Sequence, residues 1–174
     1  MNTLIGNMQN LNINSAILTE GIYKIVTINE QKLMVFESGT IYRVKKNGNL
    51  KLIKNTANHN QGYNSIDCNC KKILRHRIIG YAFLGLNIDD TKQHIDHIDG
   101  CRINNQLNNL RIVTNQQNQF NRTSAKGYIY ANKYKKYRAK IKLNKKSIYL
   151  GSINSEHDAR QAYLDAKLIY HIIN

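Results

Sequence analysis

Apolar and polar residues alternate in short runs over the first half of the chain. β-branched and aromatic residues gather in runs that are separated by turn residues such as Ser38-Gly39 and Asn47-Gly48. Runs of this length between turns are typical of antiparallel strands. The expected strands are 22–28, 33–36, 41–44 and 50–53, and the pattern continues through 61–63 and 66–74. Residues 21–85 are therefore predicted to form a β-rich module, whereas residues 1–20 show no clear pattern.

The spacing of apolar residues changes to a helical period near residue 76. It predicts a short helix over 76–84 that ends at Gly85. Two further strands are expected at 93–98 and 110–113, followed by a polar helix from about 114 to 122. Thr114 and Gln117 form a capping box, which marks the start of this helix. On such a helix, the residues at 118, 121 and 122 share one face.

The C-terminal part has a compact pattern of its own. Residues 123–127 are predicted to be a linker, and strands are expected at 128–131, 137–143 and 148–151, with a turn at 144–146. A helix should begin after Ser155, because Asp158 follows at the capping distance. Its apolar stripe consists of Ala159, Ala162, Tyr163, Ala166, Ile169 or Tyr170, and Ile173.

The middle strand of this part separates charge from apolar surface. Arg138, Lys140 and Lys142 alternate with Ala139, Ile141 and Leu143, so the two groups lie on opposite faces. A helix that covers the apolar face leaves the basic face open. The expected fold class is therefore α+β, with domains at 1–122 and 123–174. The first would hold the β-rich module and a core at 93–122, and the second a three-stranded antiparallel sheet with one helix.

Charge indicates a polyanionic partner. The 174 residues include 26 Lys and Arg against 11 Asp and Glu, a net charge of +15. Residues 126–146 alone hold nine basic and no acidic residues, so double-stranded DNA is the expected partner. The alternative is that a lysine-rich surface protects strand edges from aggregation. The candidate DNA contacts are Tyr128, Tyr130, Lys133, Lys136, Tyr137, Arg138, Lys140 and Lys142.

Neither a membrane nor a secretory role is expected. The first residues lack the pattern of a signal peptide, and the most apolar stretch, residues 78–86, is too short to span a bilayer. Three cysteines fit reduced thiols in an intracellular protein. A structural zinc site from Cys68, Cys70 and Cys101 is not expected, because their spacing lacks a second pair.

Candidate chemistry is concentrated in residues 93–121. Asp96 and His97 are neighbours at the end of a predicted strand, and an asparagine-rich segment follows them. Carboxylate and amide oxygens are hard ligands that suit Mg²⁺, and histidine is suited to take a proton from water near neutral pH. Phosphodiester hydrolysis needs both. Neighbours in a strand point to opposite faces, so either the strand ends or twists here, or the phosphate lies across its edge.

The sequence resembles two known families. Residues 94–121 resemble the HNH (ββα-metal) endonuclease signature of the type found in phage homing endonucleases, through Asp96-His97-Ile98-Asp99-Gly100, Asn104-Asn105, Asn109-Leu110-Arg111, Thr114, Asn118 and Asn121. Residues 127–173 resemble an AP2-type DNA-binding domain, through Gly127-Tyr128, Tyr137-Arg138-Ala139-Lys140-Ile141 and Tyr149-Leu150-Gly151. Two positions depart from these patterns: Cys101 replaces a usual Asn, and Tyr137 a usual Trp.

The resemblance implies a role for each site residue. His97 would be the general base, and Asn109 would tie the loop between the two strands. Asp96 and Asn118 would hold one divalent cation, Mg²⁺ with Mn²⁺ as a substitute. Supporting roles fall to Asn105, Asn121 and His94, and for His94 a structural hydrogen bond is equally open. The products would carry a 5′-phosphate and a 3′-hydroxyl.

Three biological readings follow from these features. A site-specific homing endonuclease acting as a monomer is the expected function. A restriction-type nuclease would use the same chemistry. A DNA-binding regulator with an inactive nuclease remnant is the alternative from another class.

Overall fold

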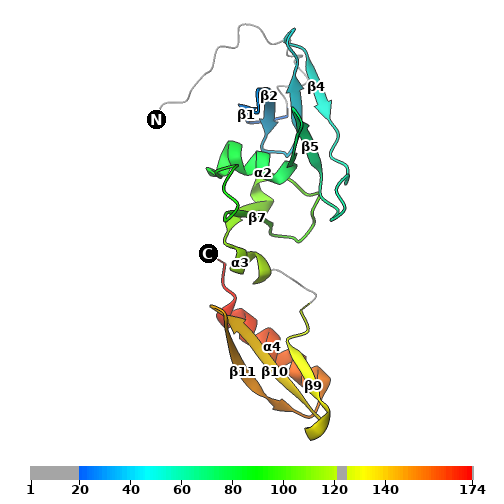
Figure 1. The fold of residues 1–174 in the computed structure, drawn as a ribbon, viewed down its shortest axis with the longest axis vertical. Coiled ribbons are helices and arrows are strands. Elements are labelled where there is room, and N and C mark those ends of the chain that lie inside the picture. The colour runs from blue at the N-terminus through cyan, green and yellow to red at the C-terminus, as the bar shows by residue number, and fades with distance from the viewer. Residues whose placement is uncertain (1–19, 121–124, 174) are drawn as a thin grey trace. The chain divides into compact units, whose positions relative to one another are not determined.

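The computed structural model describes residues 20–120 and 125–173, which form two compact units that divide between Ile112 and Val113. The first unit contains β1 (Tyr23–Ile28), β2 (Gln31–Phe36), β3 (Ile41–Val44), β4 (Leu50–Ile53), β5 (Ser65–Cys68), β6 (Lys71–Leu74), α2 (Arg75–Ile79), η1 (Gly80–Leu84), β7 (His94–His97), η2 (Leu107–Asn109) and β8 (Leu110–Val113). Strands β1 to β4 form an antiparallel sheet in chain order (Figure 1). The strands and the helix that the sequence predicts for this region are present, with the exceptions given next.

Two details of the predicted β-rich module differ. The predicted run 66–74 is a hairpin of β5 and β6, because Asn69 and Cys70 both take positive φ angles, 46° and 66°. Two left-handed residues make the tight turn that joins antiparallel strands. The prediction of strand character at 61–63 is wrong. These residues belong to a loop. The next residue, Asn64, fixes the end of this loop because its side chain donates to the backbone oxygens of Lys54 and Thr56.

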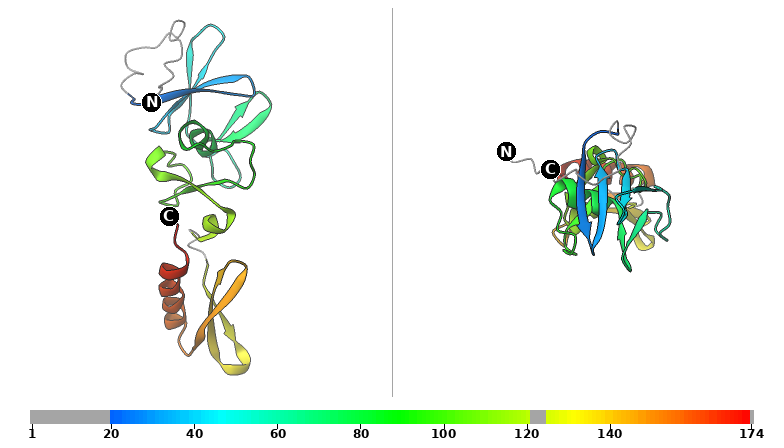
Figure 2. Two further views of the ribbon diagram at one scale, coloured as in Figure 1. Left: turned by 90° about the vertical axis from the view of Figure 1, so that its left-hand side faces the viewer. Right: turned by 90° about the horizontal axis from the view of Figure 1, so that it is seen from above.

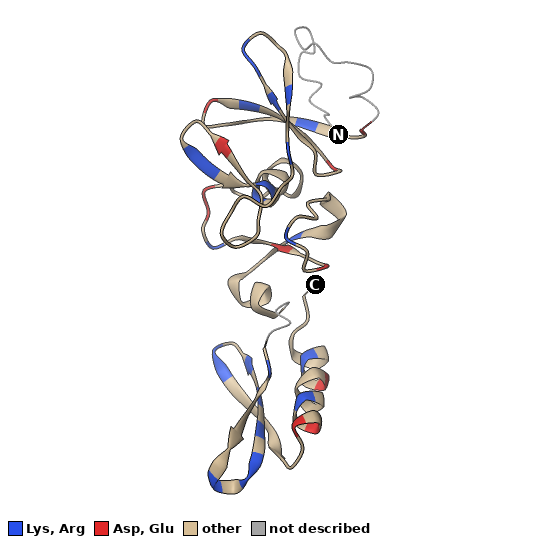
Figure 3. Cartoon of the chain, turned by 90° about the vertical axis from the view of Figure 1, so that its right-hand side faces the viewer, with Lys and Arg blue, Asp and Glu red and all other residues tan. Residues whose placement is uncertain are grey.

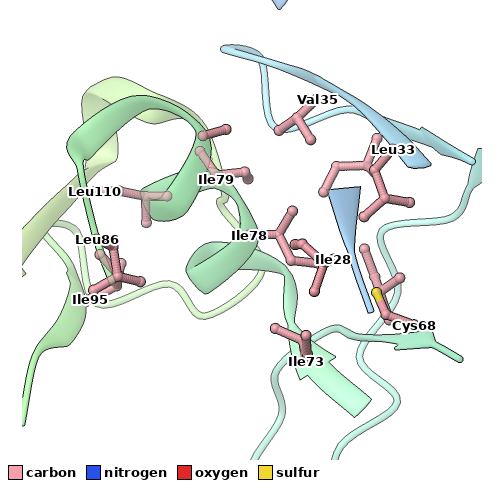
Figure 4. Packing of buried hydrophobic residues seen from close by; sticks show 13 residues of the cluster. Ile28, Leu33, Val35, Cys68, Ile73, Ile78, Ile79, Leu86, Ile95 and Leu110 are labelled. Atoms are coloured by element: carbon pink, nitrogen blue, oxygen red, sulfur yellow. The ribbon is translucent and has the colours of Figure 1, made fainter. Parts of the chain in front are cut away.

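The main core of the first unit forms where α2 packs against β2 and the hairpin. Ile78 and Ile79 of α2 are fully buried with Leu33 of β2 (Figure 4). Gly80 continues the helix at a point of close approach, since a Cβ there would lie 2.6 Å from the side chain of Ile95 on β7. The missing side chain lets β7 lie directly on the helix, which places the end of β7 beside α2.

A buried arginine joins the sheet to this helix. Arg75 begins α2, is 1 % exposed, and donates to the side-chain oxygen of Asn64 and to the backbone oxygens of Gly39, Ile53 and Lys54. Burial lowers its pKa to about 10. Neutral oxygens therefore satisfy the guanidinium, as a buried cation requires.

The second unit is a three-stranded antiparallel sheet with one long helix. Its elements are α3 (Asn115–Phe120), β9 (Tyr128–Ala131), η3 (Asn132–Tyr134), β10 (Lys136–Leu143), β11 (Lys146–Ile153) and α4 (Glu156–Tyr170). The strand order is β11-β10-β9, and α4 runs along one face (Figure 2). Ala139 and Ile141 of β10 are buried under Ala159, Tyr163 and Ala166 of α4. The predicted sheet, covering helix and Ser155 cap are confirmed.

The boundary between the units lies earlier than predicted. Helix α3 groups with the second unit, whereas the sequence placed it in the first domain. The Phe120 ring stacks on His171 with ring centres 3.9 Å apart, and Gln116 donates to the side-chain oxygen of Asn144. These contacts attach the helix to the C-terminal sheet and its helix. Within the described residues, no helix has the length and apolar character needed to cross a membrane.

Candidate active site and nucleic-acid interface

The last two residues of β7 place an acid and a base side by side. Asp96 is 5 % exposed and His97 4 % exposed. The strand ends at His97, where a turn begins as the Gly100 amide donates to the His97 carbonyl at 3.0 Å. A strand end at this point is one of the alternatives that the sequence left open. The alternation of a regular strand does not continue past His97.

His97 lies in a small group of rings. Its ring centre is 5.0 Å from that of His76 and 6.0 Å from that of Tyr63, and its Nε2 lies 3.3 Å from the side-chain oxygen of Asn105. Burial lowers the pKa of His97, although Asn105, Asp99 and Asp96 act in the opposite direction. A lowered pKa keeps the imidazole neutral at pH 7, the form that accepts a proton.

The neighbouring His76 packs in the interior. Burial, with smaller effects of His97 and Arg77, lowers its pKa to about 3, so it is neutral at physiological pH. The Arg77 guanidinium donates to the backbone oxygens of Ile88, Asp90 and Gln93. The observed contacts of both His76 and Arg77 are therefore internal.

Asp96 is paired with a residue of the adjacent strand. Arg111 on β8 donates from Nε and Nη2 to one Asp96 oxygen at 3.0 and 2.8 Å. A buried carboxylate needs a counter-charge, and Arg111 supplies it here. A divalent cation could supply the same counter-charge, and the Asp96 oxygens are hard ligands of the kind that such a cation prefers. Mg²⁺ needs only one or two carboxylates besides water and phosphate oxygens, although the described residues contain no cluster of three or more acidic, His or Cys ligands.

The loop between β7 and β8 is held by Asn109. Its side-chain nitrogen donates to Asp99 and to the Asn104 carbonyl, both at 2.9 Å, and its oxygen accepts from the Asp99 amide. Hydrogen bonds from Asn104 and Asn109, and from the Cys101 amide, lower the pKa of Asp99. These are the contacts that a residue tying this loop must make. They hold the loop in position beside the His97 ring.

The other predicted site residues are placed as follows. His94 begins β7 and is half-buried. Asn105 contacts His97 directly. Asn118 lies half-buried on α3 of the second unit. Asn121 lies outside the described residues.

Three residues of this region were not singled out as site candidates from the sequence. Tyr63 comes from the loop before β5 and has no sequence signal, because only folding brings it to His97. Arg102 stacks on the Tyr63 ring, 5.1 Å from its centre, and donates to the Gln61 carbonyl at 2.5 Å. Arg111 was noted only as part of Asn109-Leu110-Arg111. An acidic residue, Asp96, on the neighbouring predicted strand was the signal that could have identified it as a partner.

The second unit carries an open basic face. Directly paired residues of antiparallel strands share a face. Arg138 pairs with Ile129 and Ser152, Lys140 with Tyr149, and Lys142 with Ser147. Arg138, Lys140 and Lys142 are exposed, and β10 and the hairpin tip next to it carry much of the positive charge of this unit (Figure 3). The basic face is the surface formed by these three residues and the four residues that pair with them, Ile129, Ser147, Tyr149 and Ser152.

The tyrosines of this region divide between the two sides of the sheet. Tyr128, Tyr130 and Tyr137 lie on the face covered by α4, where Tyr128 donates to Glu156 of that helix. Tyr149 and Ile129 instead stand on the basic face, 59 % and 50 % exposed. Neither residue was among the candidates taken from the sequence, because alternation had to be combined with strand pairing to place them.

The remaining candidates lie around the turn between β9 and β10. Lys136 begins β10 on the same side as Arg138, and Lys133 lies in η3. Tyr134, which is 57 % exposed, has the Lys133 ammonium 5.6 Å and the Arg138 guanidinium 5.8 Å from its ring centre. Two cations thus lie near one exposed aromatic ring and make this tip positive.

The segment that holds this site matches a family of nucleases. A family model described as HNH endonuclease matches residues 74–120, which include β7, the tied loop, β8 and α3. No curated protein matches the chain. Among solved structures, the chain is similar to a structure of the HNH homing endonuclease I-HmuI, whose subject is DNA binding and cleavage by that enzyme. The two chains are 25 % identical and superpose with a TM-score of 0.43. The similarity spans 58 % of each chain, less than two thirds of that enzyme.

Proposed function

We propose that this chain is a metal-dependent DNA endonuclease that hydrolyses phosphodiester bonds, and that it is a site-specific enzyme of the homing type. One observation carries the proposal. A buried carboxylate, Asp96, and a buried neutral histidine, His97, end the same strand inside the segment that matches HNH endonucleases. An acid that can bind a cation and a base that can activate water are the parts required for this reaction.

His97 would act as the general base. It takes a proton from a water molecule, and the water oxygen attacks the phosphorus atom of the scissile phosphate. The bond from phosphorus to the 3′ oxygen breaks, and that oxygen takes a proton from solvent. The products carry a 5′-phosphate and a 3′-hydroxyl. Asn109 keeps the loop beside His97 in place through its bonds to Asp99 and Asn104.

Asp96 and Asn118 would hold one divalent cation, Mg²⁺ with Mn²⁺ as a substitute. When bound, the cation would neutralise charge on the scissile phosphate and on the departing 3′ oxygen. Asp96 supplies an anionic oxygen and Asn118 a neutral one, both of the hard type that Mg²⁺ prefers. Arg111 balances the Asp96 charge when no cation is bound.

The basic face of the second unit would hold duplex DNA. Arg138, Lys140 and Lys142 point away from α4, and a small sheet of this kind can enter a DNA groove. The second unit would then be a DNA-binding domain of the AP2 type, which its sequence resembles. The basic face would then locate the target, whereas Asp96, His97 and Asn118 would cut it.

The proposal is tested with supercoiled plasmid. The chain is incubated with Mg²⁺, Mn²⁺ or EDTA, and we expect nicked or linear DNA with either cation and none with EDTA. His97→Ala should lower the rate by about 10²–10⁴ while DNA affinity stays nearly unchanged. His157→Ala, at an exposed histidine of the second unit, is the matched control. Cleavage by His97→Ala at the normal rate would show that another group is the base.

A DNA-binding regulator is the second candidate. The observation that favours it is the pairing of Asp96 with Arg111, because an arginine occupies one oxygen of the proposed cation ligand. A regulator would bind duplex DNA, cut no plasmid under any cation, and gain no thermal stability from Mg²⁺. Cleavage that depends on Asp96 removes this candidate.

A further inference from the structure

We propose that Arg102 is a further catalytic residue of the His97 site, and that its guanidinium binds the phosphate group that is cut. Two N–H groups, on Nε and Nη2, would donate to oxygen atoms of that phosphate. This role rests on the proposed function, because it adds a contact between the same site and DNA. Its test is chosen so that either can fail alone.

Arg102 differs from the other arginines of the first unit in having free donors. Four of the five arginines in that unit are buried or half-buried and donate to protein oxygens: Arg43, Arg75, Arg77 and Arg111. Arg102 is exposed, and its one hydrogen-bond acceptor among the described residues is the Gln61 carbonyl, which takes Nη1. Nε and Nη2 are left for a ligand, and together they form one edge of the guanidinium that can bind two oxygens at once.

One aromatic ring holds this cation beside the proposed base. The Arg102 guanidinium carbon lies 5.1 Å from the centre of the Tyr63 ring, and the His97 ring centre lies 6.0 Å from the same point. Burial lowers the pKa of His97, and the Arg102 charge acts in the same direction. Base and cation therefore share one site, where a water activated by His97 and the phosphate that it attacks would meet.

The loop that carries Arg102 is fixed in place without DNA. Besides the contact of Arg102 with Gln61, the Asn55 side chain donates to the Ile103 carbonyl at 2.8 Å. Both contacts join the loop between β7 and β8 to the segment before β5. A guanidinium that is already held loses little side-chain freedom when a phosphate binds, so the contact gains in strength.

A cation at this place should affect the rate more than the affinity. Attack by water increases the negative charge on the phosphate oxygens and on the departing 3′ oxygen, so a fixed cation binds the transition state more strongly than the ground state. Arginine suits this task because its planar guanidinium matches two phosphate oxygens, whereas the ammonium of lysine is a point charge.

The alternative is that Arg102 only joins the two loops. No small ion could then replace the side chain, because joining needs a covalent link to the loop between β7 and β8. A catalytic cation can be replaced. Since Arg102 is exposed, a free guanidinium ion can reach the Tyr63 ring and the Gln61 carbonyl once the side chain is removed.

The test follows cleavage of supercoiled plasmid with Mg²⁺ at saturating protein. Arg102→Ala in the full chain should lower the rate about 100-fold. Guanidinium chloride, at a concentration that leaves the variant folded, should restore part of the rate. Urea and sodium chloride at the same concentration should not, since urea has no charge and sodium cannot donate hydrogen bonds. Arg102→Lys should keep an intermediate rate.

Lys46→Ala is the matched control. It removes one positive charge from the exposed turn between β3 and β4. Its rate at saturating protein should equal that of wild type, and guanidinium should not raise it.

Two results would overturn the inference: a wild-type rate in Arg102→Ala, or a lowered rate in the folded variant that guanidinium does not raise. Should Arg102→Ala not fold, a wild-type rate in folded Arg102→Lys overturns it. Absence of cleavage by wild type would instead overturn the proposed function. The phosphate contact is then judged by binding to duplex DNA: Arg102→Ala should lower the slope of log affinity against log salt by about 0.9, and an unchanged slope contradicts the contact.

Discussion

Individual polar residues in this chain are buried because each has a specific partner. Arg75 is surrounded by carbonyl and amide oxygens, Asp96 meets Arg111, and His97 meets Asn105. Unpaired groups of this kind cost roughly 1–3 kcal/mol each, and more when charged. A change at one partner therefore affects the other, which makes these pairs accessible to experiment.

The buried His76 should make stability depend on pH. Its pKa falls from 6.5 to about 3 on folding, so the unfolded chain binds a proton more readily. Stability is complete above pH 6.5 and is lost as pH falls toward 3. Between pH 8 and pH 5 the loss should be about 2 kcal/mol, to which the lowered pKa of His97 adds in the same direction. Urea unfolding at both pH values measures it.

Variants at two histidines identify the source of this dependence. His76→Phe keeps an aromatic ring against Tyr63 but cannot titrate, and it should show a smaller loss between pH 8 and pH 5. His157→Gln, at an exposed histidine, should behave like wild type. An equal loss in His76→Phe and wild type would contradict the assignment.

The pair of Asp96 and Arg111 predicts a link between metal and stability. Arg111→Ala removes the counter-charge of a buried carboxylate, which should cost about 3 kcal/mol. Mg²⁺ should then raise the Tm of the variant more than that of wild type, because the cation replaces the missing charge. Lys71→Ala breaks an exposed pair with Asp89 and is the control, with an expected effect within about 0.5 kcal/mol. The same Mg²⁺ response in all three proteins would argue against Asp96 as a cation ligand.

At the scale of elements, β10 combines two functions in one strand. Its residues under α4 build the core of the second unit, and the alternate residues Arg138, Lys140 and Lys142 supply the charge of the basic face. The tight turn at Asn144-Lys145, with φ angles of 49° and 65°, continues the same pairing into β11. Because the strand has only two faces, packing on one side forces the charge onto the other.

This division predicts how DNA affinity responds to single changes on the sheet. Arg138→Ala should weaken binding to duplex DNA and lower the slope of log affinity against log salt by about 0.9, the value for one phosphate contact. We expect the largest single loss here, because a guanidinium can bind a phosphate or a guanine with two hydrogen bonds. Lys167→Ala makes the same charge change on α4, on the covered side of the sheet, and should have little effect. Equal losses in both variants would mean that the basic face has no special role.

At the scale of the molecule, two units carry separate parts of the proposed function. The first holds Asp96, His97 and the tied loop, and the second holds α3 and the basic face. The stack of Phe120 on His171 joins the two ends of the second unit's chain segment. A boundary drawn after residue 122 would separate α3 from these partners.

Two fragments test this boundary. A fragment of residues 113–174 should be more stable than one of 123–174, by about 1 kcal/mol from the aromatic stack alone. Thermal unfolding of both fragments measures the difference, and His171→Ala should remove it. Both should bind duplex DNA and cut none, since His97 lies outside them. If the shorter fragment is equally stable, α3 is not part of the C-terminal fold.

The sequence by itself determined most of the secondary structure and the local chemistry. Alternation, turn residues and caps act between near neighbours, so they identified the strands, the Thr114 and Ser155 caps and the basic side of β10. The neighbouring pair of Asp96 and His97, and the spacing to Asn109, were also readable because they lie within one short segment.

Only the tertiary structure decided which distant residues complete the site. Tyr63, His76 and Asn105 meet His97 from three separate segments, and Asn55 meets Asn105 across 50 positions. The sides taken by Tyr149 and Tyr137 depended on strand pairing, and the attachment of α3 to the second unit depended on its contacts with His171 and Asn144. Such contacts arise from packing between elements, and no periodicity along the chain encodes them.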